Sequence, residues 1–442
     1  MTTDWYAPTR LLIAALLVVA AMAVPGAAKT IKPSKAARAK HALRALGYRH
    51  VHVTCARKKS CRWRAIRAGS SCTGVIRAPR RRGGPMHVSR LRCSPEKGAA
   101  RPPVLFGFNT YTTGTTLAKQ LAVGATITRL FVRWSQVERT PGAWNWSATD
   151  SAYGQIVAAG MRPLVVVTSA PCWAASSCSV AFGSPPSPSH DSGWTAYVRA
   201  VASRYPQAVG IEVWNEPNLA SVFYPQADPA RYTQLLHEAY TAVKSVHKSM
   251  PVISGGLAMN DGSGVAGPGY ASRTFLTDMF ADGAGRWMDG LGIHVYPIDI
   301  ESDGTKVWDP AAMSRWLGQV KDVEAKAGVA NLPIWVTEMG VSTTTEHGFP
   351  RAATPAQQAS YLSEMIQTAR DDPDVRAAVI DSLQDAAPNL VQDTVSKVSG
   401  SLINWDIFYN QAAEGLGIFA TNWTPKPAAC AVSKAWGGSL SC

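Results

Sequence analysis

Two glutamates that follow short apolar stretches are the residues in this chain best suited to acid/base chemistry. Glu216 lies in GIEVWNEPN (210–218), and Glu338 lies in LPIWVTEMG (332–340). Each stretch has the length and composition of a buried strand, and each leaves its glutamate near the carboxyl end. Because the carboxyl ends of parallel strands meet at one mouth of a barrel, the pair predicts acid/base and nucleophilic chemistry there. The alternative for either glutamate alone is a solvated loop residue or a helix cap.

The chain from Val104 onward contains the elements that a barrel needs to position these glutamates. Eight strand candidates are expected at residues 104–108, 127–134, 163–168, 209–214, 252–254, 291–296, 334–337 and 378–383. Eight helices are expected at 117–123, 147–159, 194–204, 229–248, 275–280, 310–327, 355–370 and 426–436. Several should begin at a capping residue before proline, as in Asp228-Pro229, Asp309-Pro310, Thr354-Pro355 and Thr424-Pro425. This series predicts an α/β fold, a (β/α)8 TIM barrel.

The motif Asn-Glu-Pro behind Val-Trp, matched by Thr-Glu-Met-Gly behind Ile-Trp-Val, resembles the retaining glycoside hydrolases of clan A, particularly families 39 and 5. The resemblance runs from about Val104 to about Trp436. It implies hydrolysis of β-glycosidic bonds in polysaccharides or oligosaccharides, with Glu216 as the acid/base and Glu338 as the nucleophile. The carboxylates of retaining enzymes stand about 5 Å apart, and those of inverting enzymes stand farther apart.

The resemblance also implies roles for four neighbouring side chains. Arg133, at the end of the second strand, would keep Glu338 anionic, with a surface salt bridge as the alternative. Asn215 would hydrogen-bond the sugar 2-hydroxyl. His294 and Tyr296 match the His-x-Tyr of the family, in which the tyrosine hydroxyl contacts the nucleophile. The alternative for His294 is a buried core histidine.

Aromatic residues are candidates for stacking on sugar rings. Trp173 and Trp134 have indoles that suit the flat apolar face of a pyranose, although most of the 15 tryptophans must belong to the core. Asn109, at the end of the first strand, is a weaker candidate. The eighth strand departs from the clan pattern, because residues 381–385, which begin at Asp381, include no aromatic residue. Trp405 from the following loop is the candidate substitute.

Two other functions compete with hydrolysis. One is a noncatalytic carbohydrate-binding barrel held at the cell surface, and the other is a transglycosylase that uses the same site. The joint presence of the two glutamates and their expected partners argues against the first. No nucleotide or flavin fingerprint is present and the chemistry needs no metal, so we expect neither a cofactor nor a metal, and a monomeric protein.

The N-terminus predicts export. Arg10 precedes an uncharged run, 11–28, with an apolar core and small residues at its exit, which indicates a signal peptide (1–28) cleaved after Ala28. An uncleaved anchor is the alternative, because the run borders on the length that spans a membrane. We therefore expect a secreted, extracellular protein that is associated with the cell surface if the N-terminal region attaches it there.

A basic module is predicted at 29–93, followed by a linker at 94–103 and the catalytic domain at 104–442. Between Lys29 and Arg101 lie 21 Lys/Arg residues and one acidic residue, Glu96, whereas 102–442 holds 22 basic and 28 acidic residues, a net charge of −6. A helix at 34–46 and strands within 48–53, 62–66, 75–77 and 87–92 predict a small β-rich fold. Its charge suits an anionic cell-surface polymer, a membrane surface or nucleic acid, with a soluble spacer as the alternative; without a readout motif, specific nucleic-acid binding is not expected.

Eight cysteines fall in local groups and, with an export signal, indicate four disulfides. Cys172 and Cys178 form one predicted pair, and Cys430 and Cys442 form another. The connectivity among the four cysteines of the module, which would staple its sheet, stays open. The spacings lack a Cys-x-x-Cys pair, which disfavours a zinc site.

Overall fold

The computed structural model describes residues 34–45, 48–55, 60–67, 70–77, 87–95, 102–109, 114–178, 183–259, 270–329, 331–345, 350–386 and 414–442. The predicted signal peptide and Trp405 lie outside these residues. Within the described ranges, no helix is both long and apolar enough to cross a membrane.

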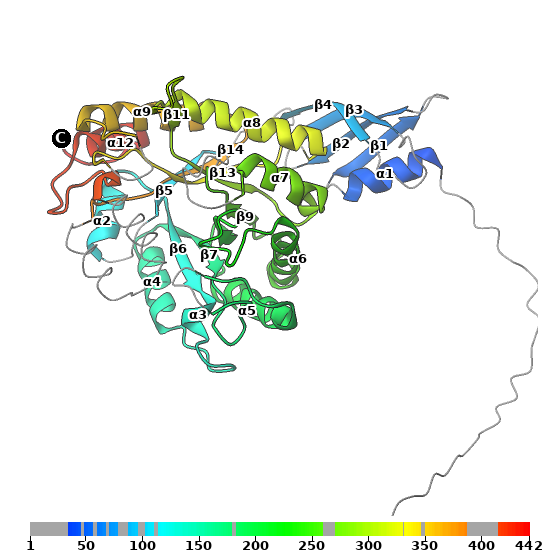
Figure 1. The fold of residues 1–442 in the computed structure, drawn as a ribbon, viewed down its shortest axis with the longest axis horizontal. Helices are drawn as coiled ribbons and strands as arrows, with labels where there is room; N and C mark the ends of the chain where they lie inside the picture. The colour runs from blue at the N-terminus through cyan, green and yellow to red at the C-terminus, as the bar shows by residue number, and fades with distance from the viewer. Residues whose placement is uncertain are drawn as a thin grey trace, which may run out of the picture. The chain divides into compact units, whose positions relative to one another are not determined.

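Eight parallel strands form a barrel, as predicted (Figure 1). They are β5 (Leu105–Asn109), β6 (Ile127–Arg133), β7 (Arg162–Thr168), β8 (Gly210–Asn215), β9 (Val252–Gly256), β10 (Leu291–Val295), β13 (Ile334–Met339) and β14 (Val375–Ile380). Each strand except β9 pairs with the next barrel strand along the chain, and β14 pairs with β5. The ring closes between β9 and β10, where Ile253 bridges Gly290 and Leu257 bridges Ile293. All the C-terminal strand ends therefore share one mouth.

Helices connect the strands at the predicted places (Figure 1). They are α2 (Gly114–Ala122), α4 (Ser147–Ala158), α5 (Asp191–Arg204), α6 (Pro229–Val246), α7 (Ser272–Ala281), α8 (Ala311–Ala327), α9 (Pro355–Asp371) and α12 (Pro427–Trp436). The predictions missed the short elements α3 (Trp134–Val137), η1 (Pro188–His190), η2 (Ala284–Arg286), β11 (Ile298–Ile300) and β12 (Lys306–Trp308).

Two of the predicted helix caps are confirmed by their hydrogen bonds. The side chain of Asp228 accepts from the backbone N–H of Arg231, and Thr354 forms a reciprocal capping box with Gln357. The prediction for Thr424 was wrong. The last helix begins two residues beyond Pro425, at Pro427, so a second proline takes the first helical position.

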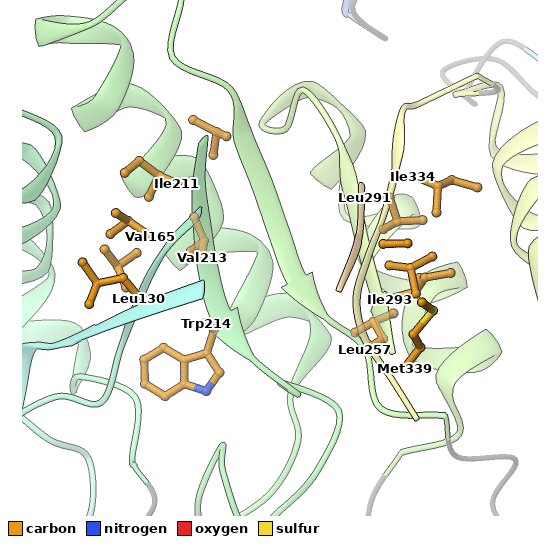
Figure 2. Close-up of a cluster of buried hydrophobic side chains, with 14 of the residues drawn as sticks. Leu130, Val165, Ile211, Val213, Trp214, Leu257, Leu291, Ile293, Ile334 and Met339 are labelled. Atoms are coloured by element: carbon orange, nitrogen blue, oxygen red, sulfur yellow. The ribbon is translucent and has the colours of Figure 1, made fainter. Parts of the chain in front are cut away.

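The core has two layers because successive strand residues point to opposite faces of the sheet. One layer lies between strands and helices, where Ile211 and Val213 of β8 pack in one cluster with Leu130 and Val165 (Figure 2). The other layer consists of residues from several strands on the opposite face: Ile127, Leu164, Val209, Ile253, Trp335, Ala377 and Val379. A charged residue on that second face is therefore surrounded by the barrel, away from the helices.

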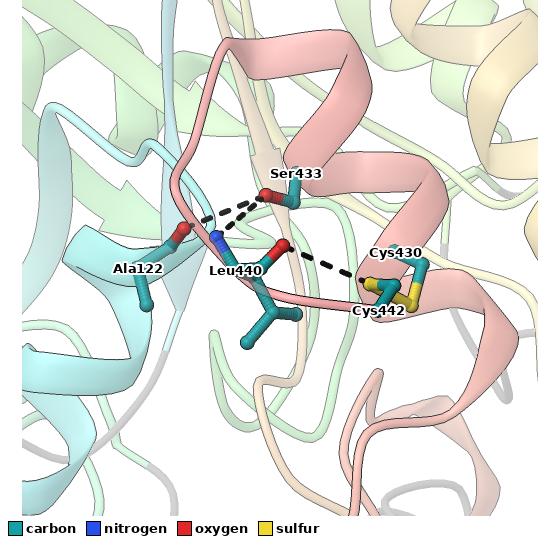
Figure 3. Close-up of a disulfide and its surroundings, with 5 residues drawn as sticks. All are labelled: Ala122, Cys430, Ser433, Leu440 and Cys442. Atoms are coloured by element: carbon teal, nitrogen blue, oxygen red, sulfur yellow. Dashed lines mark hydrogen bonds between the residues drawn. A yellow bond between two sulfur atoms is a disulfide. The ribbon is translucent and has the colours of Figure 1, made fainter.

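A disulfide and hydrogen bonds attach the C-terminal segment that follows α12 (Figure 3). The predicted disulfide between Cys430 and Cys442 ties the end of the chain to the helix. The backbone N–H of Leu440 bonds the hydroxyl of Ser433 and the carbonyl of Ala122, which is the last residue of α2. The other predicted catalytic-domain disulfide, Cys172–Cys178, is also confirmed.

The N-terminal module consists of one helix and one antiparallel sheet. The helix is α1 (Lys35–Ala45), and the strands, in sheet order, are β1 (Arg49–Cys55), β2 (Ser60–Arg67), β3 (Ser70–Arg77) and β4 (His87–Pro95). A disulfide between Cys55 and Cys61 joins β1 to β2, and Cys72 is also disulfide-bonded. The last strand extends to Pro95 and so takes up the first two residues of the predicted linker.

Candidate active site

Glu216 projects from a sharply bent strand end. Trp214 and Glu216 have φ values of 77° and 48°, in the left-handed region that costs most residues about 1–2 kcal/mol each. Hydrogen bonds hold this conformation: the backbone N–H of Glu216 donates to the carbonyl of Gly256 (2.9 Å), and the Trp214 indole donates to the carbonyl of Val222 (2.8 Å). The bend places Glu216 at the mouth of the barrel with only 5% of its surface exposed.

Glu338 is turned inward by an irregularity in β13. Val336 lies opposite Ile293 of β10, but the next pair is Glu338 with His294, so the register shifts by one residue. Such a bulge re-aims the side chains that follow it. Glu338 is 2% exposed and therefore lies within the barrel wall.

Three donors surround the Glu338 carboxylate. Arg129 Nη1 donates to Glu338 Oε1 at 2.5 Å, and Asn109 Nδ2 donates to the same oxygen at 3.2 Å. The Tyr296 hydroxyl donates to Oε2 at 3.3 Å. The predicted contact of Tyr296 with this glutamate is thus present. Donors of this kind stabilise the ionised carboxylate that a nucleophile requires.

Arg129 is itself held by a buried glutamate that the sequence analysis did not assign. Its Nε and Nη2 atoms donate to the two carboxylate oxygens of Glu212, at 3.0 and 3.2 Å. The Glu212 carboxylate also accepts from the Thr337 hydroxyl (2.9 Å) and the backbone N–H of Gly256 (3.0 Å). These four donor atoms hold the buried Glu212 carboxylate in position. Because Glu212 binds two nitrogens of Arg129, it fixes the orientation of the guanidinium toward Glu338.

Arg129 thus makes the ion pair with Glu338 that was predicted for Arg133. The two arginines are four residues apart on the same face of β6, and both guanidinium groups lie about 5 Å from the Phe131 ring between them, at 5.0 and 5.1 Å. Arg129 is the more deeply buried of the two, and it forms the ion pair with Glu338. Arg129 also donates to the side-chain oxygen of Asn215 at 3.0 Å, which orients that amide.

His294 links the two glutamates. Its Nδ1 atom lies 2.9 Å from Glu216 Oε1 and 3.3 Å from Glu338 Oε2. One oxygen from each carboxylate and this nitrogen all lie within 4.8 Å of one another. The predicted histidine thus lies in the site. The carboxylates of Glu216, which directly follows β8, and of Glu338 in β13 both lie next to its Nδ1 atom.

Burial and charge shift the pKa values in this cluster. Burial raises the pKa of Glu338 to about 7; Asp381 and Glu216 add to the rise, and His294 and Arg129 oppose it. Burial by itself lowers the pKa of His294, but the carboxylates of Glu338 and Glu216 reverse this and raise it. Arg129 stays protonated because its two glutamates outweigh the effect of its burial. The cluster can therefore exchange protons near neutral pH.

Asp381 adds a further carboxylate at the end of the eighth strand. Asn109 Nδ2 donates to Asp381 Oδ1 at 3.0 Å, as well as to Glu338, so this amide lies between the two acids. Burial raises the pKa of Asp381. Asn109, the weaker sequence candidate, is thus part of the cluster, and an acid rather than an aromatic ring occupies this strand end.

The two tryptophan candidates differ in their environment. Trp134, predicted to contact sugar, is completely buried, stacks on Tyr197 and donates to Glu138, so in this structure its indole belongs to the core. The sequence around Trp134 could not reveal this burial, because an indole at a strand end suits a core as well as a cleft. Trp173 is half-buried, packs edge-on against Trp134 and donates to the carbonyl of Glu138.

The sequence did carry a signal for the residues that were missed. Arg129 and Glu212 are charged residues inside otherwise apolar strands, and charged side chains are seldom fully buried unless they are paired. Two such residues of opposite charge on different strands of one predicted barrel indicate an internal ion pair.

The trio Glu216, His294 and Glu338 has the ligand types and spacing that could hold a metal ion. The donors already bound to Glu338 oppose this use. A guanidinium at 2.5 Å places a positive charge beside any cation held by that carboxylate. The residues present therefore fit proton transfer and nucleophilic attack better than metal binding.

Comparison with solved structures shows the same fold. A family 39 glycoside hydrolase from Bacteroides cellulosilyticus WH2 is 19% identical, with a TM-score of 0.55 over 86% of this chain and 74% of that one. A monomeric beta-xylosidase from Caulobacter crescentus CB15 is 19% identical, with a TM-score of 0.53 over 76% of this chain and 69% of that one. The GH5_18 structure from Streptomyces cattleya, in complex with GlcNAc, is 16% identical, with a TM-score of 0.53 over 78% and 82% of the two chains.

Comparison of sequences gives the family. No curated protein matches the chain. The family model described as "Glycosyl hydrolases family 39" matches residues 132–429, which include both motif glutamates. With its TIM barrel and its paired carboxylates, the chain belongs to glycosyl hydrolase family 39 and is a glycoside hydrolase.

Proposed function

We propose that this chain is an exported retaining glycosidase that cleaves β-glycosidic bonds of polysaccharides or oligosaccharides by double displacement. The observation that carries the proposal is the approach of Glu216 and Glu338, which each place one carboxylate oxygen within 4.8 Å of the other. Carboxyl groups stand about 5–5.5 Å apart in retaining enzymes and about 6.5–9.5 Å apart in inverting ones, which must fit a water molecule between carboxylate and sugar.

The environments of the two glutamates support different roles. Glu338 receives the Arg129 guanidinium, the Tyr296 hydroxyl and the Asn109 amide, all of which favour a charged, oriented nucleophile. The Glu216 carboxylate lies 2.9 Å from Nδ1 of His294, a side chain that can itself carry a proton. This contact, together with the Asn-Glu-Pro motif, supports Glu216 as the acid/base.

The reaction then follows in two steps. Protonated Glu216 donates its proton to the leaving oxygen while a Glu338 oxygen attacks the anomeric carbon, so the glycosidic bond breaks and a glycosyl ester forms. In the second step, the Glu216 carboxylate removes a proton from water, which attacks the anomeric carbon and releases Glu338. Asn215, oriented by Arg129, is placed to bond the sugar 2-hydroxyl, an interaction that strengthens in the transition state.

Trapping of the covalent intermediate tests the proposal. We would expose the purified protein to a panel of 2-fluoro glycosyl inactivators, measure its intact mass and map the labelled peptide. One sugar should add its glycosyl mass to Glu338, while the E338Q variant, treated in parallel, should add none. Label on a different residue would contradict the assigned roles, and a protein that binds polysaccharide but is never labelled would be a noncatalytic barrel.

Azide rescue separates the two roles. In E338A, azide should enter from the face that Glu338 occupied and give the α-glycosyl azide. In E216A, azide should attack the glycosyl-enzyme and give the β-product. The same anomer from both variants would contradict the assignment.

Export completes the proposal. It is supported by the basic flank and apolar core of residues 10–28 and by the even number of cysteines. Expression with the native N-terminus should deliver a protein to the medium that begins at Lys29. A product that stays membrane-bound with residues 1–28 attached would indicate an uncleaved anchor instead.

A further inference from the structure

The two faces of the module's sheet have opposite character. One face packs against α1, where Leu43 joins Val51, Trp63 and Ile76 in a buried cluster. Residues that alternate with these along the strands must point to the other face. That outward face is exposed at His52, Thr54, Arg62, Arg64, Thr73 and Arg77.

Strand register sets these side chains next to one another. His52 lies opposite Arg64, and Arg64 lies opposite Thr73, so three side chains form a row across β1, β2 and β3. In the next row Thr54 lies opposite Arg62, and Arg62 lies opposite the partly buried Val75; Arg77 lies opposite Ser60 beyond them. Neighbouring strands are about 4.8 Å apart, and side chains two residues apart on a strand are separated by about 6.8 Å. The three arginines therefore share one face with hydroxyl, imidazole and aliphatic side chains.

The module contributes no acidic residue to this face, because the sequence has none between residues 29 and 95. A flat surface of one sign attracts polyanions by counterion release and charge steering. Arginine forks bind carboxylates in pairs of hydrogen bonds, and threonine hydroxyls suit sugar hydroxyls.

We infer that the outward face of β1, β2 and β3, centred on Arg62, Arg64 and Arg77, binds a linear acidic polysaccharide with carboxylate-bearing sugars. This inference goes beyond the proposed hydrolysis. The polymer is an anchor, not the substrate, since the chain from residue 102 onward has a net charge of −6 and repels it.

The exposed side chains of this module disfavour two other anionic partners. The large hydrophobic residues exposed in the described part of the protein are Leu121, Trp144, Val246 and Ile300, and all four lie outside the module. Single-stranded nucleic acids are held on aromatic platforms, and membrane-surface elements insert apolar side chains. Trp63 and Tyr48 of the module are instead buried.

Binding of the full-length protein to immobilised polygalacturonate tests the inference. Its fully methyl-esterified form is the matched neutral probe. Wild-type protein should bind the acidic form at least tenfold more tightly than the ester, and more tightly than single-stranded DNA or anionic phospholipid vesicles at equal charge density. Equal binding to the ester, or tighter binding to DNA or vesicles, would overturn it.

Two triple variants with the same charge change locate the surface. R62S/R64S/R77S should weaken binding at least tenfold and lower its salt dependence, because three ion contacts are lost. K35S/R38S/R44S removes three exposed charges from α1 and should keep binding within threefold. An equal loss in both would show that net charge, not this face, controls binding.

Activity toward a soluble aryl glycoside separates the inference from the catalytic proposal. Both triple variants should hydrolyse it at the wild-type rate, which shows that the barrel folds, and their circular dichroism spectra should match the wild type, which shows that the module folds. E338Q should bind polygalacturonate like the wild type. Loss of binding in E338Q would place the polymer in the catalytic site and overturn the inference.

Discussion

Arg129 Nη1 lies 2.5 Å from Glu338 Oε1, and the other nitrogens of the same guanidinium bind Glu212. A single buried arginine thus joins strands β6, β8 and β13 and orients the proposed nucleophile. Removal of one partner from such a buried network leaves an uncompensated charge, which costs about 3–5 kcal/mol.

The shape of the Arg129 side chain should matter as much as its charge. In R129K the positive charge stays, but a single ammonium cannot replace the fork that binds Glu212 and Glu338 together. We expect kcat/KM on an aryl glycoside to fall about 100-fold, or about 2.7 kcal/mol of transition-state stabilisation. R133K, changed in the same way four residues further along β6, should lose much less. Equal losses of kcat/KM in R129K and R133K would contradict the assignment of this role to Arg129.

Asp381 should set the pH at which the enzyme loses activity in acid. Ionised Glu338 is required for attack, and its pKa of about 7 predicts that kcat/KM falls as the pH drops below about 7. Because the negative charge of Asp381 raises this pKa, D381N should lower it and move the acid limb to lower pH. D322N, the same change on the exposed surface of α8, should leave the limb in place. A limb that moves to higher pH in D381N would contradict this electrostatic role.

Gly256 should be irreplaceable because His294 occupies the space of its missing side chain. A Cβ atom at this position would lie 2.2 Å from His294 Nε2 and 2.5 Å from the Thr337 hydroxyl. G256A should therefore displace the histidine and lower kcat/KM at least tenfold. The control is G154A in α4, where a Cβ has nothing within 4 Å; it should keep full activity and gain about 0.5–1 kcal/mol of stability. Wild-type activity in G256A would show that the position of His294 is unimportant.

Removal of metal ions should leave the enzyme active. Glu216, His294 and Glu338 have metal-ligand spacing, but Arg129 next to Glu338 opposes a bound cation. Dialysis against EDTA should keep the rate on an aryl glycoside within experimental error, and added Zn²⁺, Mg²⁺ or Ca²⁺ should not increase it. A loss on chelation that one of these ions restores would assign the trio to metal binding.

The order and type of the barrel elements could be predicted because they depend on local pattern. Apolar runs ending in Gly, Pro or polar residues marked all eight strands, and the cap at Thr354 marked the start of α9. The strand-end position of Glu216 and Glu338 followed from the same runs. The cap at Thr424 failed because two prolines, Pro425 and Pro427, could each begin the helix, and only packing selects one.

The sequence by itself determined the barrel, the two glutamates and the opposite net charges of the N-terminal region and the catalytic domain, since periodicity, motifs and composition are read along the chain. Tertiary structure alone decided that Arg129, not Arg133, meets Glu338, that Trp134 is core, and that Glu212 and Asp381 join the site. The physical reason is that residues two or four apart lie on the same face of a strand, so the sequence pattern cannot distinguish them. Which of them contacts Glu338 depends on how deep each side chain lies in the closed barrel and on the bulge in β13.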